Sequence, residues 1–206
     1  KYFDRLRYGT IYHEMINVVE HPVYESGIVE DDGNFRIEAT FLDHGVPNIG
    51  WRITESDSRK YDPTKLKALG LHGPQIRQLQ EKGGITVEGK DISLNDVSHI
   101  RQGDSIAVVI DTRYCKEAVE IARNAQLLLC ESTYLEQDRD LAQKNFHLTA
   151  KQAATIAKEA NVDQLVLTHY SARYPDSRPF EQEAREVFPN AYAANDLMVF
   201  PFPKNR

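Results

Sequence analysis

Short apolar runs of strand-forming residues alternate with helical patterns along much of this chain. The strongest strand signals are residues 105–110, 127–130 and 165–169, each with an apolar run of at least three residues that polar side chains follow. Helical patterns cover residues 115–124 and 150–160, and in the second of these Thr149 and Gln152 have the spacing of a capping box. Strands that alternate with helices predict a layered α/β fold.

The remaining patterns predict further elements on both sides of these strands. Residues 12–19 and 35–42 favour strands, and the turn-forming residues 30–34 between them predict a hairpin. Residues 50–54 predict another strand. A brief strand at 85–88, a helix at 178–187 and a last strand at 197–200 complete the prediction.

The strand pattern stops between residues 55 and 84. Pro63 begins a helical pattern that ends at Gly70, and residues 75–82 form a second one that ends at Gly83. Gly73 and Pro74 separate the two. We interpret residues 57–82 as an arm outside the core, inserted in a domain that covers residues 1–206.

Composition narrows the class of protein. The chain of 206 residues is 41% hydrophobic and 27% charged, which is ordinary for a globular protein. Apolar runs are far too short for a membrane span and the first residues show no signal-peptide pattern, so we expect a cytoplasmic protein. Two cysteines, Cys115 and Cys130, support neither a disulfide framework nor a cysteine zinc site.

Charge is unevenly distributed. The whole chain carries −6, but residues 58–90 hold seven basic and three acidic side chains and therefore carry +4. A basic segment on an acidic body is typical of a surface that binds a polyanion, although a solvated helix face would show the same pattern.

Side chains with metal and acid–base chemistry follow the predicted strands. His44, Asp111, Glu131 and His169 come at strand or loop ends, and His147 precedes the helix at 150–160. In layered α/β folds such ends gather in one crevice, where imidazoles and a carboxylate suit zinc. Three alternatives stay open: His169 as a core histidine, Asp111 as a helix N-cap, and His147 as a neighbour of a cap. Ser171 and Arg173 either contact phosphate or tie down their loop.

Several strings of the sequence resemble, in order, the motifs of the ribonuclease Z family. They are residues 41–47, 50–53, 111–113, 131–134, 147–150, 152–154 and 167–174. The arm with Gly73 and Pro74 also resembles the tRNA-binding arm of that family. Cys130, Leu148 and Ile110 stand where the family usually has histidine, serine and glycine.

The resemblance implies a fold and an activity. The fold would be the metallo-β-lactamase αβ/βα sandwich with a protruding helical arm. The activity would be that of a zinc-dependent endoribonuclease that removes the 3′ trailer from precursor tRNA by attack of a metal-activated hydroxide, leaving a 3′-hydroxyl. Such an enzyme would hold two zinc ions per complete subunit, act as a homodimer and need no membrane.

The resemblance also implies roles for individual residues. His44 would ligate one zinc, His169 the other, and Asp111 would bridge both. His147 would protonate the departing oxygen while Glu131 holds its ring. The residues that would bind RNA are all in the arm: Lys65, Lys67, Gly73, Pro74 and Arg77.

One family motif is missing from the sequence. The string H-x-H-x-D-H, which supplies most zinc ligands in the family, does not occur in these residues. We therefore expect the sequence to be the C-terminal two-thirds of such an enzyme. The alternatives are another phosphodiesterase of the metallo-β-lactamase fold, or a non-catalytic RNA-binding module.

Overall fold

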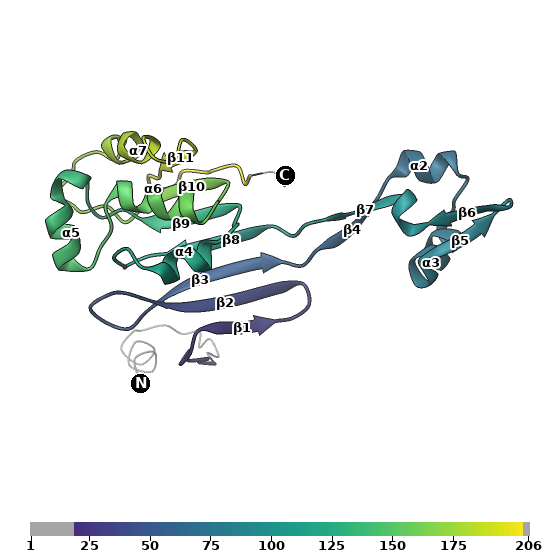
Figure 1. Ribbon diagram of the computed structural model, residues 1–206, viewed down its shortest axis with the longest axis horizontal. Helices are drawn as coiled ribbons and strands as arrows, with labels where there is room; N and C mark the ends of the chain where they lie inside the picture. The colour runs from purple at the N-terminus through teal and green to yellow at the C-terminus, as the bar shows by residue number, and fades with distance from the viewer. Residues whose placement is uncertain (1–18, 204–206) are drawn as a thin grey trace, which may run out of the picture.

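The structure is a computed structural model that describes residues 19–203, and Figure 1 shows a body from which a narrow arm extends. Within the described residues, the sheet of the body has the strand order β1-β2-β3-β8-β9-β10-β11. Pairing is antiparallel from β1 to β8 and parallel from β8 to β11. The bounds are β1 Gly27–Asp31, β2 Phe35–Leu42, β3 Asn48–Glu55, β8 Ser105–Val109, β9 Leu127–Glu131, β10 Gln164–Thr168 and β11 Ala191–Ala193.

Helices cover one face of this sheet. Helix α4 (Lys116–Ala122) packs on β2, β3 and β8, helix α6 (Ala150–Glu159) on β9 and β10, and helix α7 (Arg178–Arg185) on α6 and β11. The 3₁₀ turn η2 (Glu136–Asp138) and helix α5 (Arg139–Asn145) precede α6. The predicted α/β fold is confirmed.

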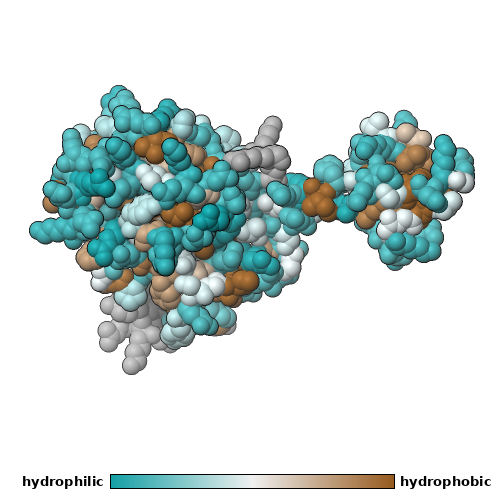
Figure 2. All heavy atoms as spheres, in the orientation of Figure 1, coloured by the Kyte–Doolittle hydropathy of each residue, from teal (hydrophilic) through white to brown (hydrophobic). Residues whose placement is uncertain are grey.

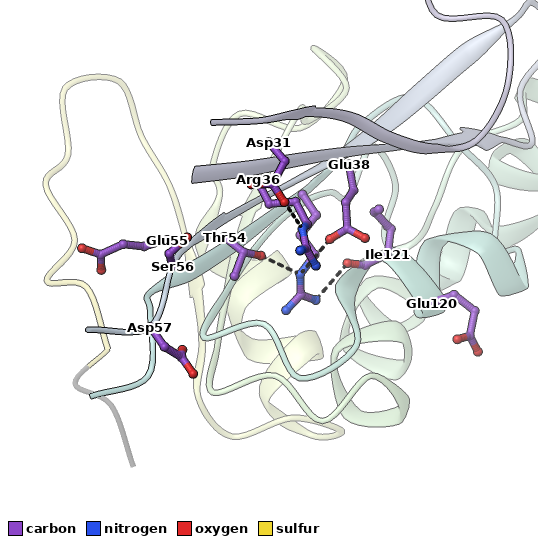
Figure 3. A pocket seen from close by; sticks show the side chains of 10 residues that line it. Asp31, Arg36, Glu38, Thr54, Glu55, Ser56, Asp57, Glu120 and Ile121 are labelled. Carbon is purple, nitrogen blue, oxygen red and sulfur yellow. Dashed lines mark hydrogen bonds and ion pairs between the residues drawn. The ribbon is translucent and has the colours of Figure 1, made fainter. Parts of the chain in front are cut away.

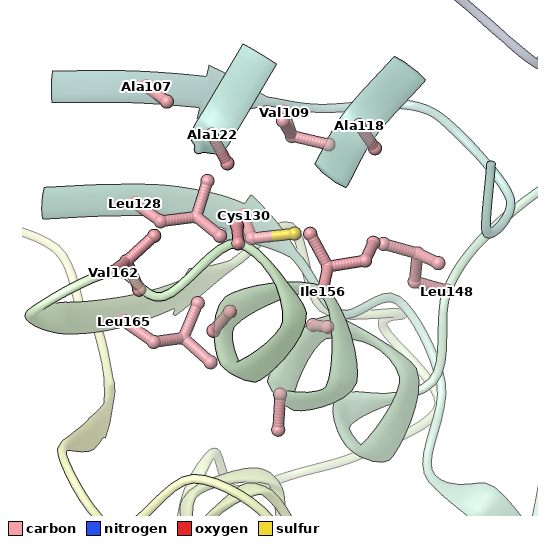
Figure 4. Packing of buried hydrophobic residues seen from close by; sticks show 14 of the residues in the cluster. Ala107, Val109, Ala118, Ala122, Leu128, Cys130, Leu148, Ile156, Val162 and Leu165 are labelled. Carbon is pink, nitrogen blue, oxygen red and sulfur yellow. The ribbon is translucent and has the colours of Figure 1, made fainter. Parts of the chain in front are cut away.

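Residues that alternate along the strands form the core beneath the helices. Ala107, Val109, Leu128 and Cys130 are all fully buried and point toward α4 and α6 (Figure 4). Four alanines of α6 are also fully buried, which lets its backbone approach the sheet closely. Burial of these side chains, at about 25 cal/mol per Å² of apolar surface, is the main force that holds the body together.

The other face of the sheet is also apolar. The strand registers place Trp51 beside Val108 and Ile53 beside Ile106, which in turn lies beside Leu127. Ile53 is exposed (40%), and the other side chains of this group are half-buried. We call this group of residues the open apolar face.

The arm is a small unit with its own core. Strands β4 (Ser58–Tyr61) and β7 (Ser98–Arg101) pair antiparallel as a stalk. The tip comprises helices α2 (Pro63–Ala68) and α3 (Gly73–Lys82), strands β5 (Gly84–Val87) and β6 (Lys90–Ser93), and the 3₁₀ turn η1 (Leu94–Asp96). Leu71, Leu79, Ile92 and Val97 are buried within the tip, and Figure 2 shows further apolar surface around them.

Capping residues explain where the arm helices begin and end. Asp62 accepts hydrogen bonds from the backbone nitrogens of Thr64 and Lys65 in the first turn of α2, which Pro63 opens. Gly83 ends α3 in the left-handed conformation, with φ of 74°. Both predicted arm helices are confirmed.

Three sequence-based expectations need correction, and a fourth lies mostly outside the described residues. The predicted hairpin strand 12–19 lies outside the described residues except for Val19, and the strand that pairs with β2 across the predicted turn is β1. Residues 58–61 and 98–101 are strands that the sequence pattern did not predict. A two-stranded stalk has no buried face, so its apolar and polar residues need not alternate. Helix α5 was missed as well. The predicted strand 197–200 is wrong: the last described strand is β11, and Leu197 is fully exposed.

Candidate metal centre

The candidate residues meet at one edge of the sheet. His44 follows β2, Asp111 follows β8, Glu131 ends β9 and His169 follows β10. Because β2 is antiparallel to β3 and β3 to β8, all four of these strands run in the same direction. Their carboxyl ends therefore share an edge, and the loop before α6 brings His147 to it.

Three of these side chains could hold a metal ion together. Asp111, His147 and His169 each offer a ligand atom, and these atoms lie within 4.8 Å of one another. Nε2 of His169 lies 3.0 Å from Oδ1 of Asp111. That oxygen is buried yet makes no hydrogen bond, because the short contact lacks hydrogen-bond geometry.

This donor set fits zinc. Two imidazole nitrogens and a carboxylate oxygen are the ligands of many catalytic zinc sites. A buried oxygen without a hydrogen bond costs free energy unless a cation or a water compensates it. A metal ion between Asp111 and His169 would provide that compensation.

Two of the candidate ligands have an unfavourable backbone conformation. Asp111 has φ of 57° and His169 has φ of 59°, in the left-handed region that non-glycine residues rarely adopt. Asn48 stabilises the first of these, since its side-chain nitrogen donates to the carbonyl oxygens of Ile110 (2.6 Å) and Asp111 (2.5 Å). Such strain at the ends of β8 and β10, the two strands that flank β9, is typical of functional sites. The sequence contained no signal for Asn48.

Glu131 is a fully buried carboxylate with five hydrogen bonds. Its Oε1 accepts from the backbone nitrogen of Thr112 (2.6 Å) and from Nδ1 of His147 (3.0 Å). Its Oε2 accepts from the Thr133 hydroxyl (2.7 Å), the Leu148 nitrogen (3.1 Å) and the Thr133 nitrogen (3.4 Å). The carboxylate thus links the ends of β8 and β9 to the start of α6, and it touches His147 as expected.

The electrostatic surroundings of His147 favour its protonated form. The hydrogen bond to Glu131 raises the pKa of the imidazole above its ordinary value, and partial burial opposes this shift only in part. The charges of Glu131 and Asp111 act in the same direction as the hydrogen bond. With Nδ1 bonded to Glu131, Nε2 is the nitrogen that remains for a metal or a proton.

His44 lies beside this group but outside it. Its ring centroid is 5.2 Å from that of His147, and its Nδ1 donates to the carbonyl oxygen of Phe146 (3.1 Å). Arg113 stacks over the Phe146 ring at 4.7 Å and pairs with Asp43 at 2.7 Å. The structure therefore brings all five candidate residues of the body together, with His147 rather than His44 closest to Asp111 and His169.

The structure bears on the alternatives for single residues, although it assigns no role to His147 or Ser171. His169 is exposed and is no core histidine. The helix after Asp111 has Cys115 as its N-cap, and the helix after His147 is capped by Thr149. Arg173 pairs with Asp138 at 3.2 Å, so it ties down its loop.

The candidate RNA-binding residues lie in the arm tip, far from the metal centre (Figure 1). Lys65 and Lys67 are in the last turn of α2, and Gly73 and Pro74 open α3. The Arg77 side chain is 82% exposed and pairs with Glu81. The structure places these residues on one small unit and does not bring them to the metal centre.

A hollow of about 620 Å³ lies elsewhere on the body, between the first strands and α4 (Figure 3). Arg52 crosses it and donates to the carbonyl oxygens of Ile121 (3.3 Å) and Arg123 (2.6 Å). Its charged lining comprises Arg36, Arg52, Asp31, Glu38, Glu55, Asp57 and Glu120. Five carboxylates against two guanidinium groups give this hollow a negative charge, which disfavours binding of a phosphate.

Comparison with known proteins identifies the family, although no family model matches the chain. The chain is 64% identical over 204 residues to the ribonuclease Z of Protochlamydia amoebophila and spans about two thirds of that protein's length (67%).

Solved structures agree on the fold. The short form of human tRNase Z superposes with a TM-score of 0.53 at 22% identity, over 87% of this chain and 48% of that one. The metallo-β-lactamase fold protein YhfI of Bacillus subtilis gives 0.50 at 20% identity, over 80% and 48%. The body thus has the predicted metallo-β-lactamase fold. The chain belongs to the ribonuclease Z family of endoribonucleases.

Proposed function

We propose that this protein is a zinc-dependent endoribonuclease that removes the 3′ trailer from precursor tRNA and leaves a 3′-hydroxyl on the tRNA. The observation that supports it most is the cluster of Asp111, His147 and His169 around a buried oxygen that lacks a hydrogen bond. The substrate is inferred from the relatives, since the similar human structure is a tRNase Z.

The three residues of the cluster, together with His44 and Glu131, each have a part in this proposal. Asp111, His169 and His44 would hold zinc, which when bound stabilises negative charge on phosphate oxygens and activates water. His147 would donate a proton to the departing oxygen, a role that its raised pKa suits. Glu131 would hold the His147 ring in the orientation that this transfer needs.

Activity is tested on the full-length protein with a precursor tRNA and zinc. The expected product ends in a 3′-hydroxyl, chelation abolishes cleavage, and added zinc restores it. Cleavage that a chelator leaves unchanged would contradict the metal dependence, and a zinc-loaded protein that binds but never cleaves the precursor would favour a binding module.

We propose further that the arm binds the tRNA away from the cleavage site. Residues 58–101 carry eight basic and five acidic side chains, a net +3, on a chain whose total is −6. Positive charge on a slender projection suits contact with a phosphate backbone.

The strand register of the stalk suggests a deletion that removes the arm and leaves the body intact. Ser58 pairs with Arg101 across the antiparallel stalk, so an Asn-Gly turn joining these residues would replace the tip and most of the stalk without disturbing β3 or β8. This deletion should weaken precursor binding strongly and reduce its salt dependence, while hydrolysis of a small phosphodiester persists. Loss of both activities in a folded protein would contradict the separation of roles.

The homodimer and the cytoplasmic location stay predictions. Sedimentation of the full-length protein tests the first. In residues 19–203 no helix is long and apolar enough to cross a membrane.

A further inference from the structure

Thr133 occupies a position between two side chains of the metal centre. Its hydroxyl lies 2.7 Å from Oε2 of Glu131 and 2.8 Å from Nδ1 of His169. The side chain is almost fully buried, with 6% of the residue exposed, so water does not compete for these contacts. No role was expected for Thr133 from the sequence.

The direction of each hydrogen bond follows from the chemistry of the groups. A threonine hydroxyl has one proton to donate, and a carboxylate can only accept. Thr133 therefore donates to Glu131 and must accept from His169, whose Nδ1 carries the hydrogen. In the neutral ring, Nε2 of His169 is then left with its lone pair.

The free nitrogen faces the candidate metal position. Nε2 of His169 lies 3.0 Å from Oδ1 of Asp111, and that oxygen makes no hydrogen bond. Two lone pairs at this distance repel each other unless a cation lies between them. An imidazole whose other nitrogen donates to an oxygen is the usual arrangement of a metal-binding histidine.

We propose that Thr133 is a positioning residue: it holds His169 in the Nδ1–H tautomer and couples it to Glu131, so that one carboxylate orients both imidazoles. Glu131 acts on His147 directly, at 3.0 Å, and on His169 through the Thr133 hydroxyl. This inference rests on the proposed metal site, and its test does not depend on RNA cleavage.

The first measurement uses full-length protein without metal and needs no change at Thr133. Histidine labelled with ¹⁵N reports the tautomer of each neutral ring, and a His169→Gln variant identifies the His169 signals. We expect the hydrogen on Nδ1. A hydrogen on Nε2 would overturn the proposal, and this result stands even if the protein proves to have no nuclease activity.

The second measurement compares Thr133→Val with Thr133→Ser. Valine keeps the shape and removes the hydroxyl, whereas serine keeps the hydroxyl. Competition with a chelator should show zinc affinity roughly 10–100-fold weaker for Thr133→Val and close to wild type for Thr133→Ser. The valine variant should also lose the single Nδ1–H signal of His169.

Two results would overturn the proposal at this stage. One is wild-type zinc affinity in a folded Thr133→Val protein. The other is an equal loss in both variants, because the hydroxyl would then not be the cause. If Thr133→Val does not fold, the tautomer of the wild-type protein and the affinity of Thr133→Ser decide the matter.

Discussion

At the scale of single residues, all three histidines of the site are held through Nδ1. His147 donates to Glu131, His44 to the carbonyl oxygen of Phe146, and His169 contacts the Thr133 hydroxyl. Each ring therefore keeps Nε2 for a metal or a proton. Rings fixed in this way lose little conformational freedom when a ligand binds, which favours tight binding.

An experiment can distinguish whether His147 acts as a proton donor or as a metal ligand. We predict that His147→Ala keeps its zinc and cleaves precursor tRNA roughly 10²–10⁴ times more slowly, because a positioned proton donor is lost. Metal per chain and single-turnover rates measure the two effects. His21→Ala, a change of an exposed histidine, serves as the control. Since the His147 ligand atom lies within 4.8 Å of those of Asp111 and His169, a drop in zinc content would instead identify a ligand.

Glu131 also matters for stability. Glu131→Gln would replace one of the two carboxylate oxygens by an NH2 group, which would face a backbone nitrogen that needs an acceptor, either that of Thr112 or that of Leu148. We predict that the free energy of unfolding falls by roughly 1–3 kcal/mol, the cost of a buried polar group without a partner. Urea denaturation measures it, with the exposed Glu186→Gln as control. Equal stability of the two variants would show that the buried network can rearrange.

At the scale of elements, the base of the arm is a tight crossing of two chain segments. Glu55 and Asp104 are joined by a backbone hydrogen bond of 2.8 Å, and Arg101 pairs with both side chains at 3.0 and 2.8 Å. The Gly103 nitrogen donates to Asp57 at 2.9 Å. This network connects the stalk to the sheet by several polar contacts, which favours a defined direction for the arm.

Gly103 makes this crossing possible. A Cβ atom at this residue would lie 1.6 Å from the carbonyl oxygen of Glu55, so Gly103→Ala must displace backbone. We predict a clear loss of precursor tRNA binding with little change in hydrolysis of a small phosphodiester. Gly84→Ala, also in the arm, meets its nearest atom at an ordinary 3.5 Å and is the matched control. Unchanged binding in Gly103→Ala would show that arm direction is unimportant.

At the scale of the whole molecule, the open apolar face leaves hydrophobic surface in contact with water. Trp51, Ile53, Ile106 and Val108 adjoin one another there. A contiguous apolar surface of this kind usually packs against further protein. We predict that the 206-residue polypeptide, expressed alone, associates with itself and holds zinc weakly.

Sedimentation at several concentrations and zinc per chain after gel filtration measure these properties. Ile53→Lys should reduce association, because it places a charge on the open apolar face. Ile100→Lys changes an apolar residue of the arm that is at least as accessible (50% against 40% exposed) and should not reduce it. A stable monomer that retains two zinc ions would contradict the prediction.

The sequence by itself determined those elements whose signals are local. Apolar runs predicted β8, β9 and β10, and the Thr149–Gln152 capping box predicted the start of α6, because burial and capping act within a few residues. The same logic predicted that polar residues at strand ends would converge on one edge. The stalk and β11 had no such signal: a narrow ribbon has no buried face, and β11 is only three residues long.

Only the tertiary structure decided which atoms meet. It placed His147 with Asp111 and His169, brought Thr133 between Glu131 and His169, and directed Asn48 toward the strained end of β8. Thr133 and His169 are 36 positions apart in the sequence, and Asn48 and Asp111 are 63 positions apart. The geometry of hydrogen bonds between such distant residues depends on the packing of whole elements. A sequence pattern reports which face of an element is buried, whereas the direction of a hydrogen bond depends on neighbours that the pattern does not specify.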